Sequence, residues 1–162
     1  MALGVRIAPL RPVHAGEALT VQRAAYVTEA QRYSAPDIPP LTETVAELRA
    51  DLAGGVLAVG AWLGPRLVGA VRGRVAGDRM EVARFVVAPD LQGRGAGRAL
   101  LGALHAAAPP EVAVLWLVTG ARSVENLRFY ARAGYTVAGR TTDPAGVGML
   151  RLELPRERLR AL

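Results

Sequence analysis

Residues 86–98 read VVAPDLQGRGAGR and connect an apolar stretch that predicts a β-strand to an Ala-rich stretch that predicts a helix. The first turn of that helix has no bulky side chains, so its backbone N–H groups are expected to be accessible. Such groups, at the positive end of the helix dipole, suit a pyrophosphate, and Gly93, Gly95 and Gly97 allow it to approach the main chain. Arg94 and Arg98 add positive charge. The segment predicts a phosphate-binding turn, with a purely structural tight turn as the alternative.

Two commoner phosphate-binding motifs do not fit this segment. A P-loop requires a Lys, and all 20 basic residues of the chain are Arg. A dinucleotide-binding fingerprint requires a third glycine, but that position is Arg98 when counted from Gly93 and Leu100 when counted from Gly95. Both motifs are therefore excluded.

The chain before the glycine-rich turn contains both helical and strand patterns. Prolines in the SAPDIPP segment at 34–40 predict a loop, and Thr44 and Glu47 have the spacing of a capping box. Short turns at 64–65 and 77–78 predict an antiparallel meander. The predicted elements are a strand at 5–10, helices at 14–33 and 43–52, and strands at 56–63, 67–76 and 79–88.

The chain after the turn predicts a change of topology. The helix that starts near Ala96 precedes an apolar strand at 112–118, and the right-handed crossover rule makes this strand parallel to the one at 79–88. Ser123 is the expected cap of the next helix, and Gly134 is its expected exit. The remaining predicted elements are that helix, at 124–133, and strands at 135–142 and 148–154.

Together these elements predict an α/β (α+β) fold. We expect a mixed, mostly antiparallel seven-stranded sheet with helices on both faces. One domain spans 1–162, with its core at about 5–154 and a short C-terminal tail at 155–162. The length of 162 residues and the hydrophobic content of 51% are sufficient for one such core.

The composition excludes several kinds of site. The chain has no Cys, which excludes disulfides, a thiolate nucleophile and a Cys-ligated metal, and neither His14 nor His105 has a clustered acidic partner that would predict a metal site. The net charge of +6 comes from Arg residues scattered along the chain, so no nucleic-acid face is expected, whereas a polyanionic small ligand fits. No signal peptide or membrane-spanning stretch is recognisable, so we expect a soluble, cytoplasmic protein without membrane contact.

Two segments resemble signature motifs of the GNAT superfamily of N-acetyltransferases. Residues 92–97, QGRGAG, are similar to the family's Q/R-x-x-G-x-G/A motif, and residues 126–135, NLRFYARAGY, are similar to its N-x-x-F-Y-x-x-x-G-F/Y segment. The order of predicted elements over roughly 5–154 is also similar to that of the family. The resemblance implies a splayed sheet that grips acetyl-CoA and transfers its acetyl group to an amine.

The resemblance also implies which residues bind the cofactor. Main-chain amides of Val86 and Val87 are expected to meet the pantetheine and the thioester carbonyl, as a form of oxyanion stabilisation. Asn126 is expected to hydrogen-bond the pantetheine arm or the reacting region, with assistance to the helix start as an equal alternative. The expected pyrophosphate-binding residues are Gln92, Gly93, Arg94, Gly95, Ala96, Gly97 and Arg98.

Tyr130 and Glu81 are the candidates for catalysis. By resemblance, the Tyr130 hydroxyl lies near the CoA sulfur and acts as a general acid when the thiolate leaves, because a phenol with a pKa of about 10 is protonated at neutral pH. Glu81 lies on the strand where some family members carry a catalytic Glu, and it is the candidate proton acceptor for the amine. The alternatives are a core aromatic for Tyr130 and a solvent-exposed carboxylate for Glu81.

The predicted function is an acetyl-CoA-dependent N-acetyltransferase without a metal. The acceptor is a primary amine of a small molecule or peptide, and it attacks directly in a ternary complex because no Cys is available for a covalent intermediate. The alternative is a non-catalytic acyl-CoA-binding regulatory module. The sequence leaves open the acceptor and a preference for longer acyl groups, and a homodimer is compatible with the expected fold.

Overall fold

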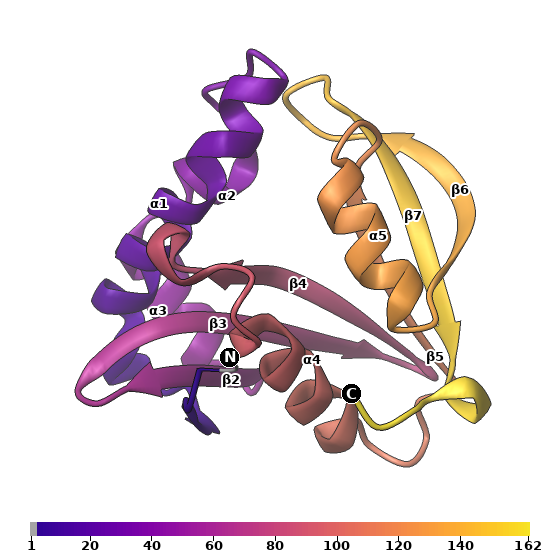
Figure 1. Ribbon diagram of the computed structural model, residues 1–162, viewed down its shortest axis with the longest axis horizontal. Helices are drawn as coiled ribbons and strands as arrows, with labels where there is room; N and C mark the ends of the chain where they lie inside the picture. The colour runs from indigo at the N-terminus through magenta and orange to yellow at the C-terminus, as the bar shows by residue number, and fades with distance from the viewer. Residues whose placement is uncertain (1–2) are drawn as a thin grey trace.

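A seven-stranded sheet runs through the molecule (Figure 1). The computed structural model describes residues 3–162. Its strands are β1 (Arg6–Pro9), β2 (Leu57–Leu63), β3 (Arg66–Ala76), β4 (Arg79–Val87), β5 (Val114–Gly120), β6 (Thr136–Thr142) and β7 (Gly148–Pro155). They lie in the order β1-β2-β3-β4-β5-β7-β6, and every neighbouring pair is antiparallel except β4 and β5. The predicted mixed, mostly antiparallel sheet and its parallel crossover are confirmed.

Helices cover both faces of the sheet, as predicted. They are α1 (Ala15–Arg32), α2 (Pro39–Thr42), α3 (Val45–Ala53), α4 (Ala96–Ala107) and α5 (Val124–Arg132), with 3-10 turns at Pro12–His14, Pro89–Leu91 and Arg156–Arg158. Helix α1 packs on β3 and β4 with α2 and α3 beside it, and α4 packs on β1 to β4 (Figure 1). None of the helices within residues 3–162 is long and apolar enough to cross a membrane.

Neighbouring residues of β3 show that α1 and α4 lie on opposite faces. The Arg72 guanidinium donates to Gln22 Oε1 of α1 at 2.9 Å, whereas a Cβ at Gly73 would lie 3.0 Å from Leu104 Cδ1 of α4. Successive residues of a strand point to opposite faces, so this pair distinguishes an α1 face from an α4 face. The close contact at Gly73 lets α4 pack directly on the strand.

Local sequence signals determine several helix ends. Thr44 N–H donates to Glu47 Oε2 at 2.8 Å, and Glu47 N–H donates to Thr44 Oγ1 at 3.2 Å. The predicted capping box is therefore confirmed, at the start of α3. Gly134 has a φ of 101° directly after α5, as its predicted role in ending that helix requires.

Two local predictions are wrong. The segment at 34–40 is not a loop throughout, because Pro39 and Pro40 are the first residues of α2, where the N–H that proline lacks would have no acceptor. Ser123 precedes α5 but does not cap it with its side chain. Its hydroxyl donates instead to Glu29 Oε2 of α1 at 2.5 Å. A contact from a helix distant in the sequence has replaced the local one.

The parallel pair β4 and β5 separates soon after it begins. Its pairing runs from Arg79 opposite Val114 to Glu81 opposite Trp116. Strand β4 then has a bulge, marked by a register shift against β3 between Ala70 and Arg72 and by a φ of 50° at Arg84. Beyond Glu81, the edge of β4 that faces β5 therefore has no strand partner.

Candidate active site

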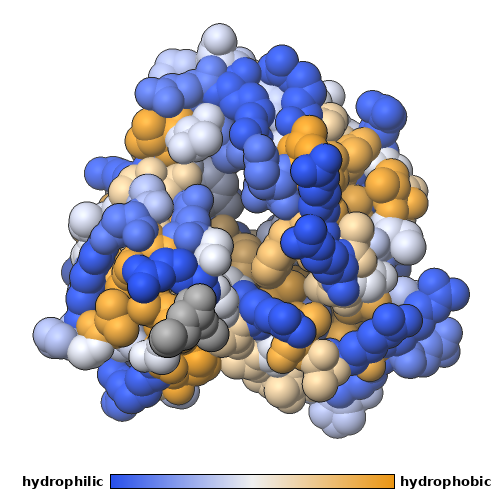
Figure 2. Space-filling model, in the orientation of Figure 1, coloured by the Kyte–Doolittle hydropathy of each residue, from blue (hydrophilic) through white to orange (hydrophobic). Residues whose placement is uncertain are grey.

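The opening between β4 and β5 leads into a cavity of about 890 Å³. One side is lined by β4 and by the glycine-rich turn before α4, and the other by the end of β5 and by α5. The C-terminal half of α1 and residues 141–144 complete the wall. Figure 2 shows the hollow between the two halves of the molecule. Both predicted catalytic residues, Tyr130 and Glu81, border this cavity.

Glycines shape the start of α4 for close approach of a ligand. Gly93 and Gly95 have φ values of 72° and 93°, which L side chains rarely adopt, and Gly95 is the N-cap residue without a side-chain cap. A Cβ at Gly97 would lie 3.3 Å from Phe85 Cζ. The first hydrogen bond into the helix is donated by Ala99 N–H to Gly95 O, at 3.1 Å. The three preceding amides of the helix therefore have no acceptor within it, as an anion-binding helix start requires.

The other residues of this turn differ in their placement. Gln92 donates from Nε2 to the Val87 carbonyl at 3.0 Å, which ties the turn back to β4. Arg98 lines the cavity, whereas Arg94 is exposed outside its lining and the Ala96 side chain is buried in the core. Of the two arginines predicted to add charge, Arg98 is thus the one that borders the cavity.

The last residues of β4 direct a main-chain amide toward the cavity. Ala88 N–H donates to Val68 O of β3 at 2.8 Å, and strand alternation then directs the Val86 amide toward β3 as well. The amide of Val87 points to the opposite edge, which has no β5 partner beyond Glu81. Both Val86 and Val87 border the cavity, but the amide of Val87 is the one directed into the opening.

Aromatic rings surround the Tyr130 side chain. Its ring centroid lies 6.1 Å from that of Phe85, 5.3 Å from that of Phe129 and 5.7 Å from that of Tyr135. Burial raises the pKa of the Tyr130 phenol well above its usual value, and Tyr26 and Tyr135 raise it further. The hydroxyl is therefore protonated at neutral pH and is a proton donor. Asn126, one turn earlier on α5, also lines the cavity.

Hydrogen bonds join α1 to the segment after β5 and close one end of the cavity. The Tyr33 hydroxyl accepts from Arg122 N–H at 2.8 Å and lies 2.9 Å from Ser123 Oγ. A Cβ at Gly120 would lie 2.2 Å from the same hydroxyl, so this contact requires glycine. The sequence predicts Tyr33 only as the last residue of the helix at 14–33. Its hydroxyl instead helps to hold the two halves of the site together.

Arg84 is a cavity residue that sequence reasoning missed. It lines the wall on the same strand as Glu81, and its left-handed backbone conformation belongs to the bulge of β4. The available signal was a charged residue interrupting the otherwise apolar stretch at 82–87. Glu81 is half-buried, and no described residue forms an ion pair or hydrogen bond with its carboxylate. Within residues 3–162, no cluster of His, Asp and Glu has the arrangement of a metal site.

His105 lies beneath the aromatic rings and should make stability depend on pH. Its Nε2 lies 2.8 Å from the Tyr135 hydroxyl, Nδ1 has no partner within residues 3–162, and burial lowers its pKa to about 4. The unfolded state therefore binds a proton below about pH 6.5 that the folded state does not bind until about pH 4. We expect the free energy of unfolding to fall by about 2 kcal/mol between about pH 7 and about pH 5, as measured by urea denaturation.

Matched variants separate this effect from other titrating groups. His105→Gln should remove the decrease, whereas His14→Gln should retain it, since His14 lies outside the aromatic cluster and contacts Arg11 and Trp62. An unchanged pH dependence in His105→Gln would contradict the assignment to His105.

The family model of the acetyltransferase (GNAT) domain matches residues 29–155. This range covers most of the chain and includes both sides of the cavity. The chain therefore belongs to the GNAT family of acetyltransferases and is an enzyme. No curated protein matches it in sequence.

Solved structures with the same fold include several acetyltransferases. The ribosomal-protein-S18-alanine N-acetyltransferase from Escherichia coli is 19% identical, with a TM-score of 0.76 over 97% of this chain and 99% of that one. The Paia N-acetyltransferase from Thermoplasma acidophilum, in complex with coenzyme A, is 16% identical, with a TM-score of 0.76 over 94% and 99%. YncA from Salmonella typhimurium, with its cofactor acetyl-CoA, is 16% identical, with a TM-score of 0.74 over 98% of each chain. These likenesses confirm the predicted fold.

Proposed function

We propose that the chain transfers an acetyl group from acetyl-CoA to a primary amine of a small-molecule or peptide acceptor. The observation that carries the proposal is that the glycine-rich turn, Glu81 and Tyr130 border one cavity. The donor is supported by the coenzyme A and acetyl-CoA in the Thermoplasma acidophilum and Salmonella typhimurium structures. The acceptor class is supported by the Escherichia coli enzyme, which is named for an alanine of a ribosomal protein.

The residues of this chain suit the donor along its length. The unpaired amides at the start of α4 and the Arg98 guanidinium provide donors and positive charge for the pyrophosphate. The Val87 amide on the open edge of β4 is positioned to donate to the thioester carbonyl, where negative charge develops. Asn126 lies across the opening and offers an amide group to the pantetheine.

The reaction is a direct displacement in a ternary complex. The neutral amine attacks the thioester carbonyl, a C–N bond forms and the C–S bond breaks. Glu81 accepts the proton that the amine must lose, and the Tyr130 hydroxyl donates a proton to the leaving sulfur. The chain has no Cys to carry the acyl group, so a Cys-linked intermediate is excluded.

The partners of the enzyme and its location in the cell are part of the same proposal. The lack of a basic run favours a small or peptidic acceptor over nucleic acid, and we place the protein in the cytoplasm without membrane contact. A homodimer is compatible with this function, because every proposed catalytic group comes from one chain.

A thiol-release screen tests the proposal. The protein is mixed with acetyl-CoA and a panel of amines that includes amino acids, polyamines, aminoglycosides and peptides, and free CoA thiol is measured with a chromogenic disulfide. We expect release that depends on both acetyl-CoA and at least one amine. Tight CoA binding without turnover across the panel would favour a regulatory acyl-CoA-binding module instead.

A further inference from the structure

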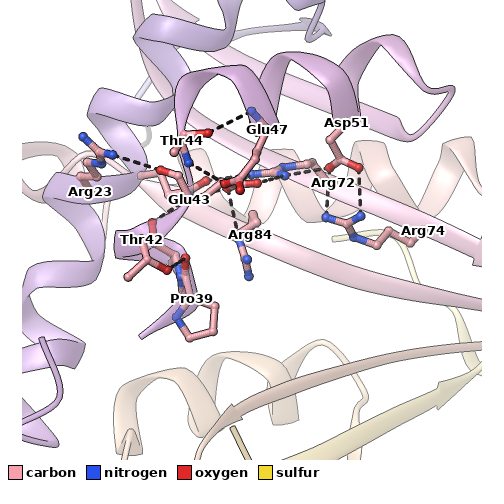
Figure 3. A network of polar contacts seen from close by, with 12 residues as sticks. Arg23, Pro39, Thr42, Glu43, Thr44, Glu47, Asp51, Arg72, Arg74 and Arg84 are labelled. Carbon is pink, nitrogen blue, oxygen red and sulfur yellow. Dashed lines mark hydrogen bonds and ion pairs between the residues drawn. The ribbon is translucent and has the colours of Figure 1, made fainter. Parts of the chain in front are cut away.

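An ion-pair cluster lies on the α1 face of β3 and β4 (Figure 3). The Arg72 side chain, 2% exposed, pairs with Glu43 and Asp51 at 2.7 Å each. Arg74 pairs with the second oxygen of Asp51, and Arg84 approaches Glu43. Three guanidinium groups thus meet two carboxylates. One positive charge of the cluster is left without a paired carboxylate.

The bonding pattern shows that Arg84 carries this surplus charge. Both terminal nitrogens of Arg72 and both of Arg74 donate to carboxylates. Arg84 approaches Glu43 only through Nε, at 3.4 Å, and its two terminal nitrogens donate to no residue within 3–162. Figure 3 shows these nitrogens pointing away from Glu43. A guanidinium fork is therefore available for a further acceptor.

The sheet register places Arg84 on the cavity wall that belongs to the α1 face of the sheet. Arg72 lies opposite Ala83, and Arg74 lies opposite Glu81. Cross-strand partners share a face, so Glu81 and Ala83 lie on the α1 face, and the contact with Glu43 places Arg84 there too. The glycine-rich turn belongs to α4, which packs on the other face. The cavity wall on the α1 face thus presents one carboxylate and one guanidinium from the same strand.

We propose that Arg84 binds a carboxylate of the acceptor, so that the acceptor is a small amino acid-type molecule with both a primary amine and a free carboxylate. This inference rests on the proposed acetyl transfer, in which Glu81 receives a proton from the amine. A planar guanidinium fork matches a carboxylate with two parallel hydrogen bonds. The single surplus charge matches a monoanion, whereas a dianionic phosphate would be repelled by Glu81 about twice as strongly as a carboxylate.

Binding to matched pairs of ligands tests the inference without requiring turnover. The CoA-loaded protein is titrated by calorimetry with free amino acids, β-alanine and 4-aminobutyrate, each beside its carboxamide. We expect at least one acid to bind about 10- to 100-fold more tightly than its amide. Arg84→Gln should abolish that preference, and Arg84→Lys should retain part of it, because Lys keeps the charge without the fork. The affinity of the amides should not change.

Arg49→Gln is the control for net charge, since Arg49 is an exposed residue of α3 outside the cavity lining. Thermal unfolding should show that all three variants are folded. Equal binding of every acid and its amide, no binding by any acid, or a preference that persists in Arg84→Gln would overturn the inference. Preferential binding without acetyl transfer would support the Arg84 site and contradict the proposed function, so the two failures are distinguishable.

Discussion

Tyr130→Phe should lower the turnover number about 100-fold while the dissociation constant for CoA changes less than about twofold. The substitution removes the one proton donor that we assign to the leaving sulfur. It keeps the ring, which packs among Phe85, Phe129 and Tyr135. Steady-state kinetics with an acceptor from the screen, together with calorimetric titration of CoA, separate the effect on turnover from the effect on binding.

Tyr135→Phe is the matched control for this experiment. It also removes a phenol from the same aromatic cluster, but that hydroxyl bonds His105 beneath the cluster and is not part of the cavity lining. We expect Tyr135→Phe to reduce stability with little effect on turnover. If Tyr130→Phe turns over at the wild-type rate, Tyr130 is a core aromatic and another group protonates the sulfur.

Arg72→Met should lower the free energy of unfolding by about 3–5 kcal/mol, the range found when one partner of a buried ion pair is removed. Arg72 is 2% exposed, and its loss leaves Glu43, Asp51 and Gln22 without the donors that they now share. Burial raises the pKa of Glu43, but hydrogen bonds from Arg72 and Gln22 outweigh it and hold that pKa at about 2. Urea denaturation at neutral pH measures the loss.

An exposed pair provides the comparison for Arg72. Arg66 bonds both oxygens of Asp90 at 2.8 Å, but its side chain is 52% exposed and the pair is screened by solvent, so Arg66→Met should cost much less than Arg72→Met. In the wild-type protein, the contribution of Glu43 to the free energy of unfolding should be present above about pH 4.5. It should be lost as the pH falls toward about 2, because the pKa of Glu43 is lowered in the folded state. Equal losses of unfolding free energy in the two Met variants would show that the buried cluster adds no more stability than the exposed pair.

Features that depend on neighbours in the sequence were predictable. The capping box at Thr44 and Glu47, the exit at Gly134 and the glycine-rich start of α4 each involve residues within one or two turns. The parallel strand followed from a handedness rule that applies to consecutive elements.

Features that depend on distant segments were not predictable. Ser123 has the residue type of a helix cap, but Glu29 lies within reach only in the folded chain and takes its hydroxyl. Arg72 occurs in an otherwise strand-like pattern, and its burial depends on two distant carboxylates, Asp51 of α3 and Glu43 at the end of α2. The bulge at Arg84 arises from the pairing of β4 with β3, which no local propensity encodes.

The sequence by itself determined the family and the glycine-rich turn at residues 92–97, because accessible amides at a helix start are a local property of glycines next to a helical pattern. The tertiary structure alone decided which side chains line the cavity wall on the α1 face. Arg84 and Glu81 share that wall because β4 bulges and separates from β5. The surplus charge of Arg84 arises because Glu43 and Asp51 pair mainly with the two arginines of β3. Long-range packing sets those positions.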